Sequence, residues 1–307
     1  MRDVLYRNPV GFRAGVEARI RAEAAAASHR TVDQVRRQFL LQRFLVRVFA
    51  GPDGPWVLKG GTGLIVRIPG ARHSDDIDLL YSEQEALLEN AVADLRRLAD
   101  RAPEGDFLRF EIAEPVIGSG QDVGHVVAQL KVSSYLGTVE YGRFPLDLSL
   151  NQRTAEAVDL IQPRPVIELP GDKPLPKFVL YPLAEQVADK VCAMYGKYGI
   201  NGDRPSTRYR DLVDLTIIIT TQELDASRTV RALRDEAKRR ILVLPMRLSV
   251  PGTDWEVGYG RVAGGTLLPI ELRAVDPALN AVSGCLQPLL DGTVAEGTWN
   301  PLQMSWN

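Results

Sequence analysis

Apolar side chains that recur every three or four residues predict helices in both halves of the chain. Thr31 and Ser82 each stand just before such a stretch, where a hydroxyl side chain can accept hydrogen bonds from the first backbone N–H groups. The helical stretches are residues 14–28, 31–50, 62–68, 83–101, 183–198, 208–221 and 226–241.

Alternation of apolar and polar residues predicts strands in the first half of the chain. The expected strands are residues 56–59, 75–81, 107–117, 125–134 and 144–150. A proline-rich stretch at 162–182 then interrupts regular structure. We therefore expect a bilobal α/β (α+β) protein, with N-terminal helices and a mixed-sheet core in residues 1–165 and a mainly helical lobe in 166–307. The stretch 245–307 gives no clear pattern.

The composition is that of an ordinary globular protein of 307 residues, with 45% hydrophobic and 25% charged residues. No apolar run approaches the ~20 residues needed to cross a membrane, and the N-terminus has no secretion signal. The two cysteines provide no disulfide framework. These features predict a cytoplasmic protein with no membrane partner.

Positive charge is concentrated in two places although the net charge is only −2. Residues 1–50 contain ten Arg and four acids, and residues 228–247 contain seven Lys or Arg and two acids. Arg36, Arg43 and Arg47 recur at helical spacing. Such basic faces are either solvated surfaces or surfaces that bind the phosphate backbone of a nucleic acid.

The densest chemical signal is LKGGTGLIVRIPGARHSDDIDLL, between Leu58 and Leu80. A glycine turn after a short strand lets backbone N–H groups approach a polyphosphate at a helix N-terminus, here at Gly60, Gly61 and Thr62. Asp76 and Asp78 lie two apart in a predicted strand, so both side chains should point to one face. Adjacent carboxylates repel one another unless a hard cation such as Mg²⁺ or Mn²⁺ lies between them.

Asp147 is a candidate third carboxylate. Phe144, Leu146 and Leu148 alternate to one face of their strand, so Asp147 emerges on the other. If this strand lies beside that of Asp78, Asp147 would join the metal site and could accept a proton from an attacking hydroxyl. The alternative is a solvent-facing aspartate on an edge strand.

Two more polar residues fall on apolar helix stripes. Lys190 shares the edge of a stripe with Val187 and Met194, where it either extends to water or meets an anion such as a triphosphate. Asp211 is in phase with the apolar residues after it, whereas Asp214 is turned away by about 60° and should point outward or sideways. Asp211 therefore needs a partner, and a Lys190–Asp211 pair could be functional or purely structural.

Taken in order, these motifs resemble the AbiEii/AbiGii family of nucleotidyltransferase-like toxins from bacterial toxin–antitoxin and abortive-infection systems. The resemblance covers about residues 30–225. The motifs that carry it are LKGGTGL, RHSDDIDL at residues 72–79, ADK at 188–190 and RDLVDL at 210–215.

The resemblance implies a DNA polymerase-β-type core and a role for each matching residue. Asp76 and Asp78 would hold Mg²⁺ or Mn²⁺, with an NTP as substrate. Lys190 would contact phosphates, and Asp211 would complete the site. Ser74 would contact the nucleotide or be a place where phosphorylation blocks activity. The remaining nucleotide- and phosphate-binding positions are Gly60, Gly61, Thr62 and Arg72.

The implied reaction moves a nucleoside monophosphate from an NTP to an acceptor hydroxyl, with the 3′ end of tRNA as the expected acceptor and a separately encoded antitoxin as the expected partner. The basic N-terminal helices and the 228–247 segment would then bind the RNA. Two alternatives stay open at this point. One is transfer onto a protein, and the other is a catalytically silent module that binds NTP or a partner.

Overall fold

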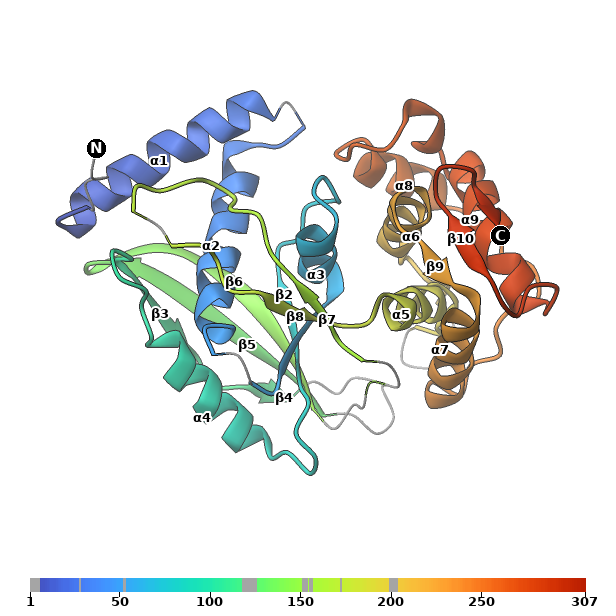
Figure 1. Cartoon of the computed structure of the whole chain (residues 1–307), viewed down its shortest axis with the longest axis horizontal. Coiled ribbons are helices and arrows are strands. Elements are labelled where there is room, and N and C mark those ends of the chain that lie inside the picture. Colours follow the sequence, from blue (N-terminus) through green and yellow to red (C-terminus); the bar gives the residue numbers. More distant parts are fainter. Residues whose placement is uncertain are drawn as a thin grey trace. The chain divides into compact units, whose positions relative to one another are not determined.

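The computed structural model divides the chain into two compact units, both shown in Figure 1. The first comprises Met1–Arg67, His73–Arg153 and Val158–Leu180, and the second comprises Ile68–Arg72, Thr154–Ala157 and Tyr181–Asn307. The main passage between them follows Leu180 rather than residue 165, because residues 178–180 still form a strand of the first unit. The structure describes residues 6–27, 29–51, 54–117, 126–150, 154, 157–171, 173–198 and 204–307.

The first unit is built on an eight-stranded mixed sheet, in the order β3-β5-β6-β2-β1-β8-β7, with β4 paired to β5. The pairs β2–β6 and β1–β8 are parallel and the other pairs are antiparallel. The strands are β1 (Trp56–Lys59), β2 (Ile77–Tyr81), β3 (Leu108–Ile112), β4 (Val116–Ile117), β5 (Val126–Leu136), β6 (Val139–Leu150), β7 (Asp159–Ile161) and β8 (Phe178–Leu180).

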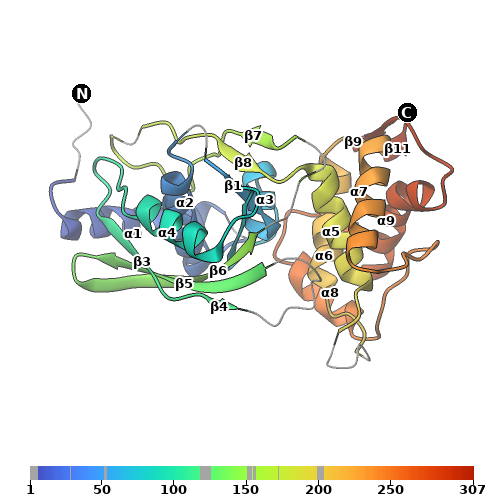
Figure 2. The same ribbon diagram turned by 90° about the horizontal axis from the view of Figure 1, so that it is seen from below.

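Helices cover the apolar face of this sheet. The helices of the unit are α1 (Pro9–Ala26), α2 (Val32–Val48), α3 (Gly60–Arg67) and α4 (Leu88–Ala99). Figure 2 shows α2 and α4 on one side of β5 and β6. Phe44 of α2 packs edge-on against Phe110 and Phe144, with ring centroids 5.3 and 5.5 Å away. Since Phe144 points to this core, Asp147 must point away from it.

The basic face predicted on the second helix is wrong for three arginines. Arg43 and Arg47 are only 4% and 1% exposed, and both pair with the buried carboxylate of Asp106. Burial lowers the pKa of Arg47, although the charge of Asp106 opposes the shift. Arg36 pairs with Glu17 of α1. These guanidinium groups hold the helices in place and are not available to bind a phosphate backbone.

Most of the predicted elements are present, with changes at their ends. Thr31 caps α2, as predicted, and Gln34 completes a capping box with it. The helix expected from residue 83 begins only at Leu88, because the backbone and side chain of Ser82 both donate hydrogen bonds to the carbonyl of Pro55. The strand predicted at 107–117 is divided into β3 and β4. The strand expected from residue 125 begins within the described residues at Val126.

The second unit is mainly helical. Its helices are α5 (Leu183–Tyr195), α6 (Tyr209–Thr221), α7 (Ala226–Arg239), α8 (Trp255–Ala263), the short 3-10 helix η1 (Ile270–Leu272) and α9 (Val275–Leu290), and its strands are β9 (Leu224–Asp225), β10 (Thr298–Asn300) and β11 (Ser305–Trp306). The stretch 245–307 is therefore ordered around α8 and α9.

Helix α6 lies at the centre of this unit. Every residue from Asp211 to Ile219 is buried, because α5, α8 and α9 all pack on it. Trp299 of β10 reaches it too, where the indole N–H donates to the carbonyl of Ile219 at 2.7 Å. Such a helix has no solvent-facing side. Within the part of the chain that is described, no helix is both long and apolar enough to cross a membrane.

Candidate active site

The glycine turn joins β1 directly to α3. Gly60 has a left-handed backbone, with φ of +61°, and a Cβ atom at this position would overlap the carboxylate of Asp78. Both constraints require glycine. The carboxylate of Asp78 therefore lies beside the N-terminal end of α3, where the helix dipole favours negative charge.

Two hydroxyl groups hold Asp76 in place. The side chain of Thr62, in the first turn of α3, donates a hydrogen bond to the main-chain oxygen of Asp76 at 2.6 Å. The hydroxyl of Ser74 donates to the Oδ1 atom of Asp76 at 2.7 Å. Both hydroxyl residues are buried, as is Gly61. The turn and the aspartate pair, which lie more than ten residues apart in sequence, thus form one structure.

The third carboxylate arrives from β6. In the parallel pairing of β2 with β6, Asp78 stands directly opposite Asp147, between the pairs Ile77–Leu146 and Leu79–Leu148. The apolar members of these pairs are buried on the core side, so the aspartates share the opposite face. Asp76 precedes β2 by one residue and lies two before Asp78. All three aspartates thus lie near one face of the sheet, and the charge of Asp76 reaches Asp147.

Asp147 carries the signature of an uncompensated carboxylate. Its Oδ1 atom is buried and has no hydrogen-bond partner among the described residues. Burial and the negative charge of Asp76 raise the pKa of Asp147, and a hydrogen bond from Gln129 only partly opposes this. Such an oxygen atom can bind a cation or accept a proton.

The chemistry of these donors fits a hard divalent cation, which prefers carboxylate oxygens. The unpartnered Oδ1 atom of Asp147 offers one ligand. Among the described residues, however, no three acidic, His or Cys side chains are already gathered around one point. The reason is local, because Ser74 holds Asp76 and the carboxylate of Asp78 lies against Gly60. Small side-chain rotations would have to accompany cation binding.

A second charged cluster lies in the second unit, where Lys190 of α5 reaches two aspartates of α6. Its Nζ atom makes a short contact with Asp214 and lies 3.4 Å from the Oδ1 atom of Asp211. The pairing with Asp211 was predicted. The outward orientation of Asp214 was not correct, since this residue is 0% exposed.

Two arginines complete this cluster. Arg72 contacts both oxygens of Asp214, at 2.8 and 2.9 Å, and Arg208 contacts Asp211 at 2.9 Å. For Lys190, burial favours the neutral amine, but the charges of Asp214 and Asp211 outweigh it, so its pKa is raised. For Asp214, burial is likewise outweighed by Lys190 and Arg72, and its pKa is lowered. Each of the two aspartates in this cluster therefore faces two cations.

The residues predicted for the site therefore fall into two groups. The first unit brings together Gly60, Gly61, Thr62, Ser74, Asp76, Asp78 and Asp147, and the second contains Arg72, Lys190 and Asp211. Sequence reasoning missed Asp214, Arg208 and Gln129. The spacing of Asp211 and Asp214 was visible in RDLVDL, but a helical wheel cannot show that a helix is buried on all sides.

Comparison with known proteins identifies a family and similar folds. The family described as nucleotidyl transferase AbiEii toxin, of a type IV toxin–antitoxin system, matches residues 43–281. The chain is similar to the structure of MenT4, a nucleotidyltransferase toxin from Mycobacterium tuberculosis H37Rv, with 19% identity over 88% of this chain and 89% of that one and a TM-score of 0.56. It is also similar to JHP933 from Helicobacter pylori, with 17% identity over 86% and 95% of the two chains and a TM-score of 0.48. No curated protein sequence matches it.

Proposed function

Because this chain belongs to the AbiEii nucleotidyltransferase toxin family, we propose that it transfers a nucleoside monophosphate from an NTP to the 3′ end of a tRNA. This transfer would block translation and growth. The observation that supports this most strongly is the register of β2 and β6, which sets Asp147 beside Asp78. The family also implies a cognate antitoxin as partner.

The glycine turn would receive the phosphates of the NTP. A helix N-terminus presents backbone N–H groups without helical partners, and the helix dipole favours an anion there. The carboxylate of Asp78 already lies beside Gly60, at the start of α3. A phosphate and a carboxylate repel one another at such short range, so productive binding requires positive charge between them.

Asp76, Asp78 and Asp147 would hold Mg²⁺ or Mn²⁺, which supplies that charge and lowers the pKa of the attacking hydroxyl. Thr62 and Ser74 fix the backbone and the side chain of Asp76 for this task. Asp147 is also proposed to accept the proton of the acceptor hydroxyl, since its Oδ1 atom has no hydrogen-bond partner in the described part of the chain.

Residues of the second unit are also proposed as necessary for transfer. Lys190 keeps its positive charge because two aspartates face it, and Arg72 keeps a fixed orientation through two contacts with Asp214. Asp211 holds both Lys190 and Arg208. Charges held in fixed positions stabilise phosphates without reorganisation during the reaction.

The test is to incubate the protein with each labelled NTP, Mg²⁺, total tRNA and a protein extract, and to compare it with Asp76→Ala. We expect label in tRNA and a loss of about 10²-fold or more in the variant. Asp75→Ala is the matched control, because this neighbouring aspartate is largely exposed and pairs with His73 instead. Label in protein would overturn the tRNA acceptor, and no label under any condition would overturn the transferase reaction.

A further inference from the structure

Helix α7 presents a row of cations on its outer face. Its buried face consists of small and apolar residues and Glu236. Arg231, Arg234 and Lys238 are exposed and lie within about 60° of one another around the helix axis. We call these three residues the α7 stripe.

The stripe differs from the other cations near the end of α7. Arg239 and Arg240 are both held by Glu236, and Asp189 of α5 pairs with each of them. Their charge is used inside the unit. Arg234 and Lys238, by contrast, form no ion pair within the described part of the chain. Ion pairs in the described part of the chain therefore do not explain the charges of Arg234 and Lys238.

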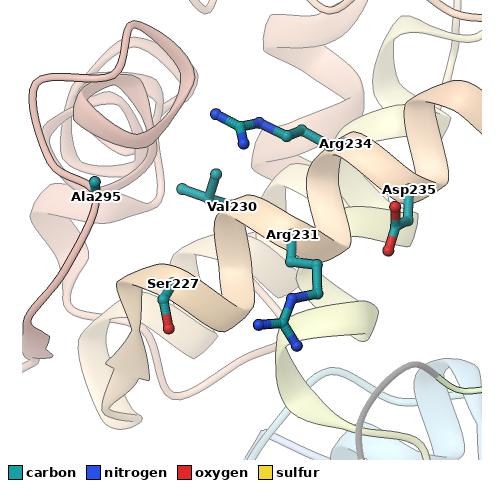
Figure 3. A pocket seen from close by; sticks show the side chains of 6 residues that line it. All are labelled: Ser227, Val230, Arg231, Arg234, Asp235 and Ala295. Carbon is teal, nitrogen blue, oxygen red and sulfur yellow. The ribbon is translucent and has the colours of Figure 1, made fainter.

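A groove accompanies the stripe, with a volume of about 460 Å³. It runs between α7 and the segment that contains Ala295. In Figure 3, Arg234 extends with Val230 toward Ala295, while Arg231, from the same outer face, extends away from Ala295. The two guanidinium groups thus diverge and can reach separate anions.

The spacing of the stripe selects the kind of anion. From Arg231 to Lys238 the helix rises roughly 10 Å, at 1.5 Å per residue. One strand of a duplex carries about three phosphates over that axial length. A free nucleotide would need cations that converge on one point and a ring to stack on the base. The six residues that line the groove provide neither, since they are Ser227, Val230, Arg231, Arg234, Asp235 and Ala295.

We propose that the α7 stripe binds the phosphate backbone of the RNA acceptor, a role that rests on the proposed function. It would position RNA by charge without reading its sequence. The stripe would then contribute to the affinity for RNA and not to the chemical step. This assigns RNA binding to α7, while the buried arginines of α2 have no part in it.

The test is the triple variant Arg231→Gln/Arg234→Gln/Lys238→Gln. We expect it to bind tRNA about 10-fold or more weakly at moderate salt. The slope of log affinity against log salt concentration should fall by roughly 2, since each lost phosphate contact removes about 0.7–0.9. In the transfer assay, KM for tRNA should rise while kcat and KM for NTP stay unchanged. A purely structural role would not separate these constants.

The matched control is Lys197→Gln/Arg247→Gln/Arg261→Gln, which removes the same two Arg and one Lys from exposed positions of the same unit. An unchanged salt slope in the stripe variant, or equal losses in both triple variants, would overturn the proposal. If the protein binds tRNA through the stripe but labels only protein, the proposed acceptor is wrong and the stripe stands. If wild-type protein does not bind tRNA, both proposals are wrong.

Discussion

Two groups of aspartates, one in each compact unit, differ in how their negative charge is balanced. Asp211 and Asp214 face Lys190, Arg72 and Arg208, so each carboxylate has a cation. Within the described part of the chain, Asp147 instead has one oxygen without a hydrogen-bond partner, and its pKa is raised by burial and by Asp76. The fold supplies cations for Asp211 and Asp214 but leaves this oxygen of Asp147 for a ligand.

This difference distinguishes charged groups that stabilise the fold from charged groups that can bind a ligand. A buried and matched cluster contributes rigidity, and its removal should affect stability first. A buried carboxylate without a partner lowers the stability of the ligand-free protein, and such a group is typical of a site that binds a ligand. Substitutions in each group, together with Mg²⁺ binding, test whether one group mainly stabilises the fold and the other mainly binds a ligand.

The largest effect on stability is expected from Asp214→Asn. The change keeps the shape of the side chain but leaves Lys190 and Arg72 without their shared counter-charge in a buried place. We expect a loss of about 3–5 kcal/mol in the free energy of unfolding, measured by urea denaturation. Asp235→Asn on the exposed face of α7 is the control, with an expected change within about 0.5 kcal/mol. Equal stability of the two variants would contradict a structural role for Asp214.

A smaller loss is expected from Lys190→Met. This variant removes one cation, but Asp214 keeps Arg72 and Asp211 keeps Arg208. We expect a loss of about 1–3 kcal/mol, a transition that stays cooperative, and transfer activity reduced about 10²-fold or more. The measurements are urea denaturation and labelled transfer at a temperature where the variant is folded. An unfolded variant would show that the lysine is only structural, and full activity would remove it from the reaction.

The smallest effect is expected from Asp147→Asn, and its sign is opposite. The folded state raises the pKa of Asp147 above its unfolded value, so the ionised form destabilises the fold fully at pH values above that raised pKa. The penalty declines once the pH falls below that raised pKa and is gone below the pKa of the unfolded chain. We therefore expect Asp147→Asn to raise Tm by about 1–2 °C at pH 7, with the gain vanishing under acidic conditions.

Divalent cations sharpen this last comparison. Mg²⁺ should raise the Tm of the wild-type protein more than that of Asp147→Asn, because ligand binding to the folded state stabilises it by mass action. Thermal unfolding with and without Mg²⁺ measures this without reference to activity. A Tm gain for Asp147→Asn that is independent of both pH and Mg²⁺ would show that Asp147 is not an uncompensated ligand.

Arg43 and Arg47 of α2 are paired inside the core, whereas Arg231 and Arg234 of α7 are exposed. The sequence alone could not distinguish these two sets of arginines. Both segments read as basic helices with regular spacing. Arg43 and Arg47 are buried because Asp106, some sixty residues later, supplies a carboxylate inside the core. No local pattern reveals such a distant partner, so the prediction that Arg43 and Arg47 lie on an exposed basic face was wrong.

Local sequence patterns were sufficient to assign the two faces of strands β2 and β6. Alternation in β2 and β6 fixed which side Asp78 and Asp147 take, since successive residues of a strand point in opposite directions. The left-handed turn at Gly60 and the capping box at Thr31 were also fixed locally, by the residue types that such backbone geometry needs.

Tertiary structure decided which of these faces meet. The parallel register that sets Asp78 opposite Asp147 joins strands separated by α4, β3, β4 and β5, and many registers would satisfy the same alternation. Tertiary structure also buried Asp214. Because α6 is enclosed on all sides, the periodicity of its sequence does not identify a solvent-facing side. Local patterns record how a side chain points from its own element, whereas charge balance depends on which elements the folded chain brings together.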